Sequence, residues 1–254
     1  MSKANWDDIE HCGDVTVADF SQYKDKIDIL IGGSPCQGFS FAGKQLNFND
    51  PRSKLFFEFV RALRETKPKY FLLENVVMKK EYQDVISSYL GVEPIEINSS
   101  LVSAQNRRRL YWTNIPNVSL PHDKNITLDD ILENIDFSNP AAIRGRRLNK
   151  GAVVGRRLDE NSHRQDYNKT IPITQCLEVR ATNTNKSNCL TTVGKDNVLT
   201  SLPVGRHPNA FKNKLPFRYY TLKEMCRLQT VPDDYLDMIP QPHGRYWAMV
   251  EQLM

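Results

Sequence analysis

The stretch 26-KIDILIGGSPCQG-38 decides the fold, because an apolar run passes straight into a polar loop at its carboxyl end. The run from Ile27 to Ile31, closed by Gly32 and Gly33, predicts a short buried strand. Pro35 and Cys36 follow this strand directly. The sequence therefore predicts a cysteine at the exposed end of a buried strand.

Helical and strand patterns alternate outward from this stretch. Residues 50–68 predict a helix, with Asp50 as N-cap, Pro51 in the first turn and Pro68 ending it. Further patterns predict a strand over 69–76, a helix over 80–91 closed by Gly91, and strands within 92–100 and 108–115. Strands alternating with amphipathic helices predict a doubly wound α/β fold with a parallel sheet.

The composition is that of an ordinary globular protein, with 40% hydrophobic and 25% charged residues among 254. No run of 18 apolar residues occurs and the N-terminus has no apolar signal core, so we expect a cytoplasmic protein without a membrane span. Five cysteines without CxxC spacing argue against disulfides or structural zinc, and the five histidines form no metal-binding pair. We expect no metal.

Basic residues are concentrated in one region, although the net charge is only +4. Six of them lie between residues 144 and 157 with no acid among them: Arg144, Arg146, Arg147, Lys150, Arg156 and Arg157. Such clustering predicts a polyanionic partner. We expect a catalytic domain over 1–116, a small, partly irregular lobe over 117–215, and a segment over 216–254 that returns to the first domain. In that segment Thr221 and Glu224 predict a capping box and Pro232 a helix stop.

Two polar side chains follow buried strands, Cys36 after the first and Glu74 within 69–76. Ligands bind beyond the carboxyl ends of the strands in doubly wound sheets, so we expect both groups to face one cleft. Each alone also fits a plainer interpretation, since most buried cysteines serve packing and many strands end at a solvated acid.

The combination is more specific. The blocks "GGSPCQGFSFAGKQ", "SKLFFEF", "LLENV", "SAQNRRRLYW" and "YTLKEMCRLQTVPDDY" resemble, in this order, the motifs of the C5-cytosine DNA methyltransferases. The likeness covers about residues 10 to 238. It is strongest to phage and bacterial members, including those of restriction–modification systems, with some likeness to the eukaryotic de novo branch. The resemblance implies a Rossmann-like class I methyltransferase sheet.

The resemblance also implies catalytic roles. Cys36 would add as a thiolate to C6 of a cytosine flipped out of the duplex. Glu74 would hold N3 and the exocyclic amine of the base, for which a carboxyl group in an apolar pocket, with a raised pKa, is suited. Arg109 would contact O2. Arg107, together with Gln105, would brace the loop and the DNA phosphates, and Arg108 is expected to face solvent.

Double-stranded DNA is the implied partner. A loop over 37–44 resembles the closing loop of the family, with Gln37 filling the space left by the base and Ser40 and Lys44 contacting DNA. The basic lobe occupies the place of the target-recognition region, so its arginines would divide between phosphates and guanine edges. Those expected to do so are Arg144, Arg146, Arg147, Arg156 and Arg157, and Thr191 and Thr192 resemble phosphate contacts.

The implied methyl donor is S-adenosylmethionine, for which Asp14, Pro35 and Leu55 are the matching contacts. The 254 residues contain neither the Gly-x-Gly of the family's donor loop nor the Gly-Asn pair of its last helix. We therefore expect a truncated or split member, with a second polypeptide supplying the missing strands. The alternative is a methyltransferase-like protein that binds DNA or regulates without turnover.

Two further classes fit less well. A transfer-RNA methyltransferase is disfavoured because the Cys-Phe-Thr signature of that branch does not occur. A thiol oxidoreductase is disfavoured because Cys36 has no resolving cysteine at CxxC spacing. The host compartment implied by the resemblance is the cytoplasm of a bacterium or of a phage-infected cell.

Overall fold

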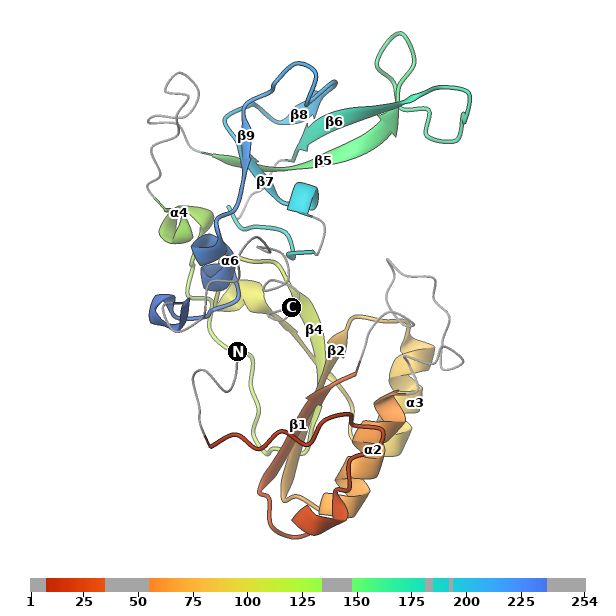
Figure 1. Cartoon of the computed structure of the whole chain (residues 1–254), viewed down its shortest axis with the longest axis vertical. Coiled ribbons are helices and arrows are strands. Elements are labelled where there is room, and N and C mark those ends of the chain that lie inside the picture. Colours follow the sequence, from red (N-terminus) through yellow and green to blue (C-terminus); the bar gives the residue numbers. More distant parts are fainter. Residues whose placement is uncertain (1–7, 35–54, 134–147, 181–184, 192–193, 237–254) are drawn as a thin grey trace. The chain divides into compact units, whose positions relative to one another are not determined.

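The computed structural model describes residues 8–34, 55–133, 148–180, 185–191 and 194–236 (Figure 1). The chain forms two compact units. Among the described residues, the first unit contains those up to 99 together with 107–122, and the second contains 100–106 together with those from 123 onward. The domain functions expected from the sequence stay predictions.

The first unit is built on a four-stranded sheet in the order β1-β2-β4-β3. Its strands are β1 (Ile29–Gly33), β2 (Tyr70–Val76), β3 (Ile95–Asn98) and β4 (Arg108–Thr113). Two helices accompany them, α2 (Leu55–Thr66) and α3 (Lys80–Leu90), with a short 3-10 helix at Ser21–Tyr23. Another 3-10 helix, Ser99–Leu101, lies where the chain passes from the first unit to the second. The α/β class is thereby confirmed, with each expected strand and helix present in its segment.

The expectation of a parallel sheet is wrong for two of the three strand pairings in this sheet. β1 and β2 are parallel, but β4 runs antiparallel to both β2 and β3. Parallel neighbours need a crossover of a dozen or more residues, and the connection over 99–107 is too short for one. β3 and β4 therefore pair in opposite directions.

The core of the first unit lies between the two helices and one face of the sheet. Phe56 of α2, Leu73 of β2, Ile86 of α3 and Trp112 of β4 are each fully buried there. Gly32 permits the close approach of α2, because a Cβ at this position would lie 2.7 Å from the Phe59 ring. α3 ends as expected at Gly91, whose φ of +72° is in the left-handed region.

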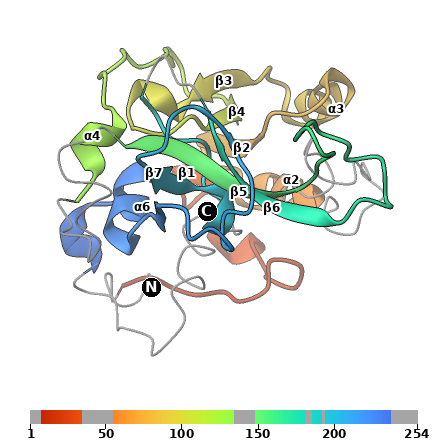
Figure 2. The same ribbon diagram turned by 90° about the horizontal axis from the view of Figure 1, so that it is seen from above.

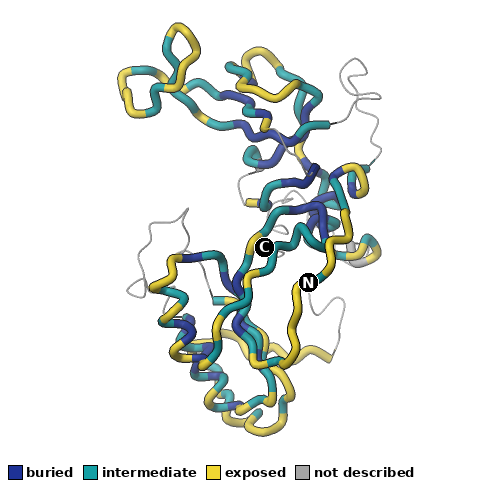
Figure 3. Tube along the Cα trace, turned by 180° about the vertical axis from the view of Figure 1, so that it is seen from behind, coloured by how far each residue is buried: buried dark blue, intermediate teal, exposed yellow. Residues whose placement is uncertain are grey.

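The N-terminal segment of this unit is exposed over residues 8–17, as the yellow tube in Figure 3 shows. Arg61 of α2 fastens it by donating to the carbonyls of Val15 at 2.7 Å and Ala18 at 3.0 Å. The Arg61 guanidinium also lies 4.8 Å from the centre of the Phe20 ring.

The second unit contains a five-stranded sheet in the order β8-β6-β5-β7-β9, in which every pairing is antiparallel. Its strands are β5 (Asn149–Arg157), β6 (Ile173–Val179), β7 (Val198–Thr200), β8 (Gly205–His207) and β9 (Phe217–Tyr219). The described part of the expected irregular lobe is thus mainly a regular sheet. Its core is formed by residues that alternate along the strands, including Val153, Leu177, Val179 and Val198.

Two short helices of the second unit lie beside each other, α4 (Leu128–Ile131) and α6 (Leu222–Leu228) (Figure 2). The predicted capping box of Thr221 and Glu224 is confirmed. α6 ends at Leu228 rather than at Pro232, and short 3-10 helices lie at Gly194–Asp196 and Asp233–Leu236. Within the described part of the chain, no helix is long and apolar enough to cross a bilayer.

Candidate functional site

Glu74 and Arg109 form an ion pair at the carboxyl end of β2. Glu74 lies opposite Tyr111 in the β2–β4 ladder, and Arg109 lies two residues earlier on β4. Both side chains therefore point to the face of the sheet that α2 and α3 leave uncovered. Arg109 Nε is 2.8 Å from Glu74 Oε1, with the two side chains 15% and 33% exposed. The surroundings of Glu74 among the described residues are thus charged rather than apolar.

The charges of Glu74 and Arg109 affect the pKa of the neighbouring Tyr111. Burial raises the pKa of the Tyr111 phenol above its usual value, and the nearby Glu74 carboxylate raises it further. Arg107 and Arg109 act in the opposite direction. Three of the predicted catalytic residues, Glu74, Arg107 and Arg109, therefore act electrostatically on one phenol, within one unit.

β1 ends beside this pair. Gly33 pairs with Glu74 in the parallel ladder, and a Cβ on Gly33 would lie 3.3 Å from Glu74 Oε2. The carboxylate therefore lies over the last residue of β1. Cys36, the predicted nucleophile, comes three residues later and lies outside the described residues.

Asn75 fixes the chain just before the predicted nucleophile. Its side chain is almost fully buried, and Nδ2 donates to Ser34 Oγ at 2.8 Å. Asn75 Oδ1 accepts from the Val76 amide at 2.8 Å. We did not single out Asn75 from the sequence, although it neighbours Glu74. The signal was an amide placed where the alternation of β2 requires a buried, apolar side chain.

The predicted donor-binding residues are described in part. Asp14 is exposed, and its carboxylate accepts from the amide and the hydroxyl of Thr16, both at 2.9 Å. The amide bond and then the hydroxyl bond lower the pKa of Asp14. Leu55 is half-buried at the start of α2, and Pro35 lies outside the described residues.

Several predicted DNA contacts also lie outside the described residues: Gln37, Ser40, Lys44, Arg144, Arg146, Arg147 and Thr192. Of those described, Gln105 is fully buried and belongs to the second unit, where it bridges to Ser187. The chain thus crosses between units inside the Gln-x-Arg-x-Arg pattern.

The remaining predicted DNA contacts lie in the second unit. Thr191 is exposed, and its hydroxyl donates to Asp196 at 3.0 Å. Arg156 and Arg157 follow each other on β5 and so point to opposite faces of the sheet. Arg156 binds Glu178 of β6, whereas the Arg157 amide donates to Asp166. Glu178 was not selected from the sequence, because only basic and uncharged polar residues were considered as DNA contacts.

No group of His, Cys, Asp or Glu within the described ranges is arranged to hold a metal ion. The described cysteines are not joined in disulfides, and Cys176 and Cys226 are buried, Cys189 half-buried and Cys12 exposed.

Comparison with known proteins identifies relatives. Residues 2–89 match the family described as C-5 cytosine-specific DNA methylase. The type II methyltransferase M.Eco47II of Escherichia coli is 51% identical over 75 residues, which are 30% of this chain and 18% of that protein. The type II methyltransferase M.NgoBV of Neisseria gonorrhoeae is 37% identical over 153 residues, covering 52% of this chain and 36% of that protein. The chain thus spans less than half the length of these relatives.

The fold has a counterpart among solved structures. The Entamoeba histolytica methyltransferase EhMeth superposes with a TM-score of 0.63 at 14% identity, covering 98% of this chain and 79% of that one. This likeness concerns the fold, whereas the sequence matches concern descent. The sequence matches thus relate part of the chain, including residues 2–89, to the C5-cytosine-specific DNA methylase family.

Proposed function

We propose that this chain carries out the base-side chemistry of cytosine C5 methylation on duplex DNA. The observation that supports this is the Glu74–Arg109 pair, held at 2.8 Å over Gly33 at the end of β1. Cys36 follows Gly33 by three residues in the sequence, and three residues span at most about 11 Å. In the proposed site, a thiolate, a carboxylate and a guanidinium act on a single nucleobase.

Each group has a separate task in the proposed reaction. The Cys36 thiolate forms a bond to C6, which converts the ring into an enamine whose C5 is nucleophilic. Glu74 binds the N3 side of the ring and Arg109 donates to O2, which draws electrons from C6 and favours addition. After methylation, loss of the C5 proton and of the thiolate restores the aromatic ring.

Arg109 positions Glu74 as well as the base in this scheme. The Arg109 guanidinium contacts one Glu74 carboxylate oxygen through Nε. It is also held by a hydrogen bond that it donates to the Arg108 carbonyl at 2.9 Å. An arginine held by its own strand and by a carboxylate loses little freedom when the base arrives. Arg107 adds positive charge on the same side.

The methyl donor implied by the family is S-adenosylmethionine, which supplies an electrophilic methyl group when bound. The described residues fit it in part. Asp14 offers an ionised, exposed carboxylate that can accept from an amine, and Leu55 offers an apolar surface at the start of α2. We propose these two residues, with Pro35, as donor contacts.

We further propose that a second polypeptide completes the sheet. β1 is the edge strand of the described sheet, and two of its side chains, Ile29 and Ile31, are 42% and 66% exposed. An edge with exposed apolar residues favours pairing with another chain. The same observation favours the second candidate function, a DNA-binding member without turnover on its own.

Covalent trapping tests the proposed chemistry. The chain is incubated with S-adenosylmethionine and duplex DNA containing 5-fluorocytosine, and protein–DNA adducts are resolved by denaturing electrophoresis. We expect an adduct that Cys36→Ser abolishes and that Cys12→Ser, which removes an exposed thiol of the same chain, leaves unchanged. An adduct that survives Cys36→Ser would refute the assignment.

Binding of labelled S-adenosylmethionine separates the two candidate functions. Binding together with adduct formation supports an enzyme. DNA binding without donor binding, in a chain whose folding is confirmed by circular dichroism, supports the DNA-binding alternative.

A further inference from the structure

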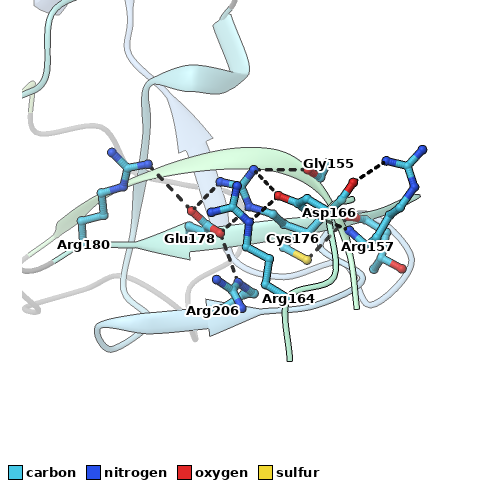
Figure 4. Close-up of polar contacts among 10 residues, drawn as sticks. Gly155, Arg157, Arg164, Asp166, Cys176, Glu178, Arg180 and Arg206 are labelled. Carbon is cyan, nitrogen blue, oxygen red and sulfur yellow. Dashed lines mark hydrogen bonds and ion pairs between the residues drawn. The ribbon is translucent and has the colours of Figure 1, made fainter. Parts of the chain in front are cut away.

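In the second unit, the carboxylate of Glu178 contacts three arginines on one face of the sheet formed by β8, β6 and β5 (Figure 4). Glu178 of β6 accepts from Arg156 of β5 through both oxygens, at 2.8 and 3.2 Å. It also accepts from Arg206 Nε of β8 at 3.1 Å. Arg180 Nη2 lies 3.8 Å from its second oxygen.

The strand register brings these side chains together. Glu178 and Arg206 are directly opposite each other in the β6–β8 ladder, and Arg180 follows Glu178 by two residues. Glu178 and Arg156 share the same face of the β5–β6 ladder, where Arg156 pairs with Thr174. The carboxylate is 13% exposed, whereas Arg206 and Arg180 are 33% and 59% exposed. The acid is thus recessed and the arginines surround it.

The face carries an excess of positive charge. Asp166 is the second acid of the cluster, and it pairs with Arg156 at 3.7 Å and with Arg164. Four arginines therefore share two carboxylates. The same excess is felt by Lys150, whose pKa is lowered by burial first and then by Arg180.

The arginines retain donors after pairing. A guanidinium has five N–H groups, and within the described part of the chain Arg206 engages Glu178 through Nε alone. Arg180 approaches Glu178 through one terminal nitrogen only. Both exposed side chains can therefore bind an anion without giving up Glu178.

We propose that this face binds the phosphate backbone of duplex DNA and that Glu178 is its positioning residue. The inference rests on the proposed DNA methyltransferase function and adds Arg180 and Arg206, which the sequence analysis did not select, to the DNA contacts. Guanidinium forks match phosphate oxygens in geometry and charge, and backbone contacts of this kind fix the orientation of a protein on the duplex.

Glu178 acts by allowing the arginines to converge. Three guanidiniums around one point repel one another, and a recessed carboxylate between them removes that repulsion. It also holds Arg156 in a two-point grip, which fixes the spacing of the cluster. Hydrogen bonds from Arg156, followed by burial in the opposite direction, give Glu178 a net lowered pKa, so it stays ionised.

The test is the salt dependence of DNA affinity, measured with the full chain and a fluorescent duplex between about 50 and 200 mM salt. Arg206→Gln and Arg180→Gln are each expected to reduce the slope of log affinity against log salt by about 0.9, the value of one phosphate contact. Over this range the affinity of each variant should fall about 3.5-fold less than that of the parent chain. Arg108→Gln is the matched control, because Arg108 is also an exposed arginine paired with a carboxylate, that of Glu96, but it lies on β4 of the first unit.

Glu178→Gln tests the positioning role. Replacing this acid removes one negative charge, so an account based on net charge alone predicts tighter DNA binding. The positioning role predicts weaker DNA binding and a smaller slope of log affinity against log salt. Glu96→Gln makes the same charge change away from the cluster and is expected to leave the slope unchanged. Melting curves of each variant establish that it is folded, and the arginine variants test the surface independently of Glu178.

The proposal is overturned if the parent chain does not bind duplex DNA, or if Arg180→Gln and Arg206→Gln behave like Arg108→Gln. Binding to anionic lipid vesicles but not to DNA, with the same dependence on Arg206, would assign the face to a membrane surface instead. If the parent chain forms no Cys36 adduct while these slopes are as expected, the proposed chemistry is refuted and the DNA-binding role of this surface still holds.

Discussion

The bond between Asn75 and Ser34 makes a specific prediction about how β2 supports the residue expected to act as nucleophile. Asn75→Ala removes the donor to Ser34 Oγ at 2.8 Å and the acceptor for the Val76 amide at 2.8 Å. A hydrogen bond contributes about 1 kcal/mol, and a buried group left without its partner costs about 1–3 kcal/mol. We therefore expect Asn75→Ala to lower the free energy of unfolding by about 2 kcal/mol.

A double-mutant cycle isolates the contact itself. Ser34→Ala should lower the free energy of unfolding by about 1 kcal/mol, because it removes one partner of one hydrogen bond. The double variant should be less destabilised than the sum of the two, with a coupling energy of about 1 kcal/mol. Urea unfolding followed by fluorescence gives the stabilities, and the rate of adduct formation with 5-fluorocytosine DNA gives the functional effect.

This experiment distinguishes an effect of Asn75 on the position of Cys36 from an effect on the stability of the fold. If Asn75 holds Ser34 so that Cys36 is presented, both single variants slow adduct formation under conditions in which each is fully folded. A coupling energy near zero would refute the stabilising contact. Unchanged adduct rates in folded variants would show that Asn75 supports the sheet and not the nucleophile.

Three further predictions concern the second unit. Glu224 is fully buried and accepts from Arg218 at 2.6 and 2.7 Å, so Glu224→Ala should cost about 3–5 kcal/mol in urea unfolding, more than the shape-conserving Glu224→Gln. Hydrogen bonds from Arg227 lower the pKa of Asp233 to about 2 from 3.8. The stability that the ionised Asp233 adds is therefore present above about pH 4 and lost as the pH falls to about 2. The melting temperature of Asp233→Asn should not show this loss. Burial raises the pKa of Tyr220 to about 12 from 10.0, so the neutral phenol stabilises the fold below pH 10 and this gain disappears as the pH rises through about 12. The tyrosinate absorbance titration of Tyr220→Phe should therefore contain one late-titrating group fewer than that of the parent chain.

The elements of the first unit could be predicted because their patterns are local. Apolar residues repeat every three or four positions in α2 and α3, and Gly91 supplies the left-handed residue that ends α3. The direction of β4 was predicted wrongly, because a rule for crossover units was applied to a connection too short to cross. Strand direction depends on the length of the connection as much as on the pattern of the strand.

Residues of the candidate site could be proposed from the sequence only where a local pattern or a family resemblance marked them. Glu74 was found because it interrupts an apolar strand, and Arg109 through a resemblance. Asn75 and Glu178 were not found, because their partners are far apart along the chain: Ser34 precedes Asn75 by 41 residues, and Arg206 follows Glu178 by 28. Such contacts depend on which strands pair with each other, and a short stretch of sequence does not contain this information.

The two carboxylate–arginine arrangements differ in stoichiometry, and the difference matches two kinds of ligand. Glu74 and Arg109 form a one-to-one pair, which directs donors and acceptors while keeping net charge low. Such a pair suits a nucleobase, which is neutral and is recognised by hydrogen-bond geometry. Glu178 is shared by three arginines and leaves an excess of positive charge, which suits phosphates, whose attraction depends on charge and on released counterions. If the Glu178 cluster binds DNA phosphates and Glu74 and Arg109 bind the base, as proposed, added salt should weaken the phosphate contacts and have little effect on a base already bound.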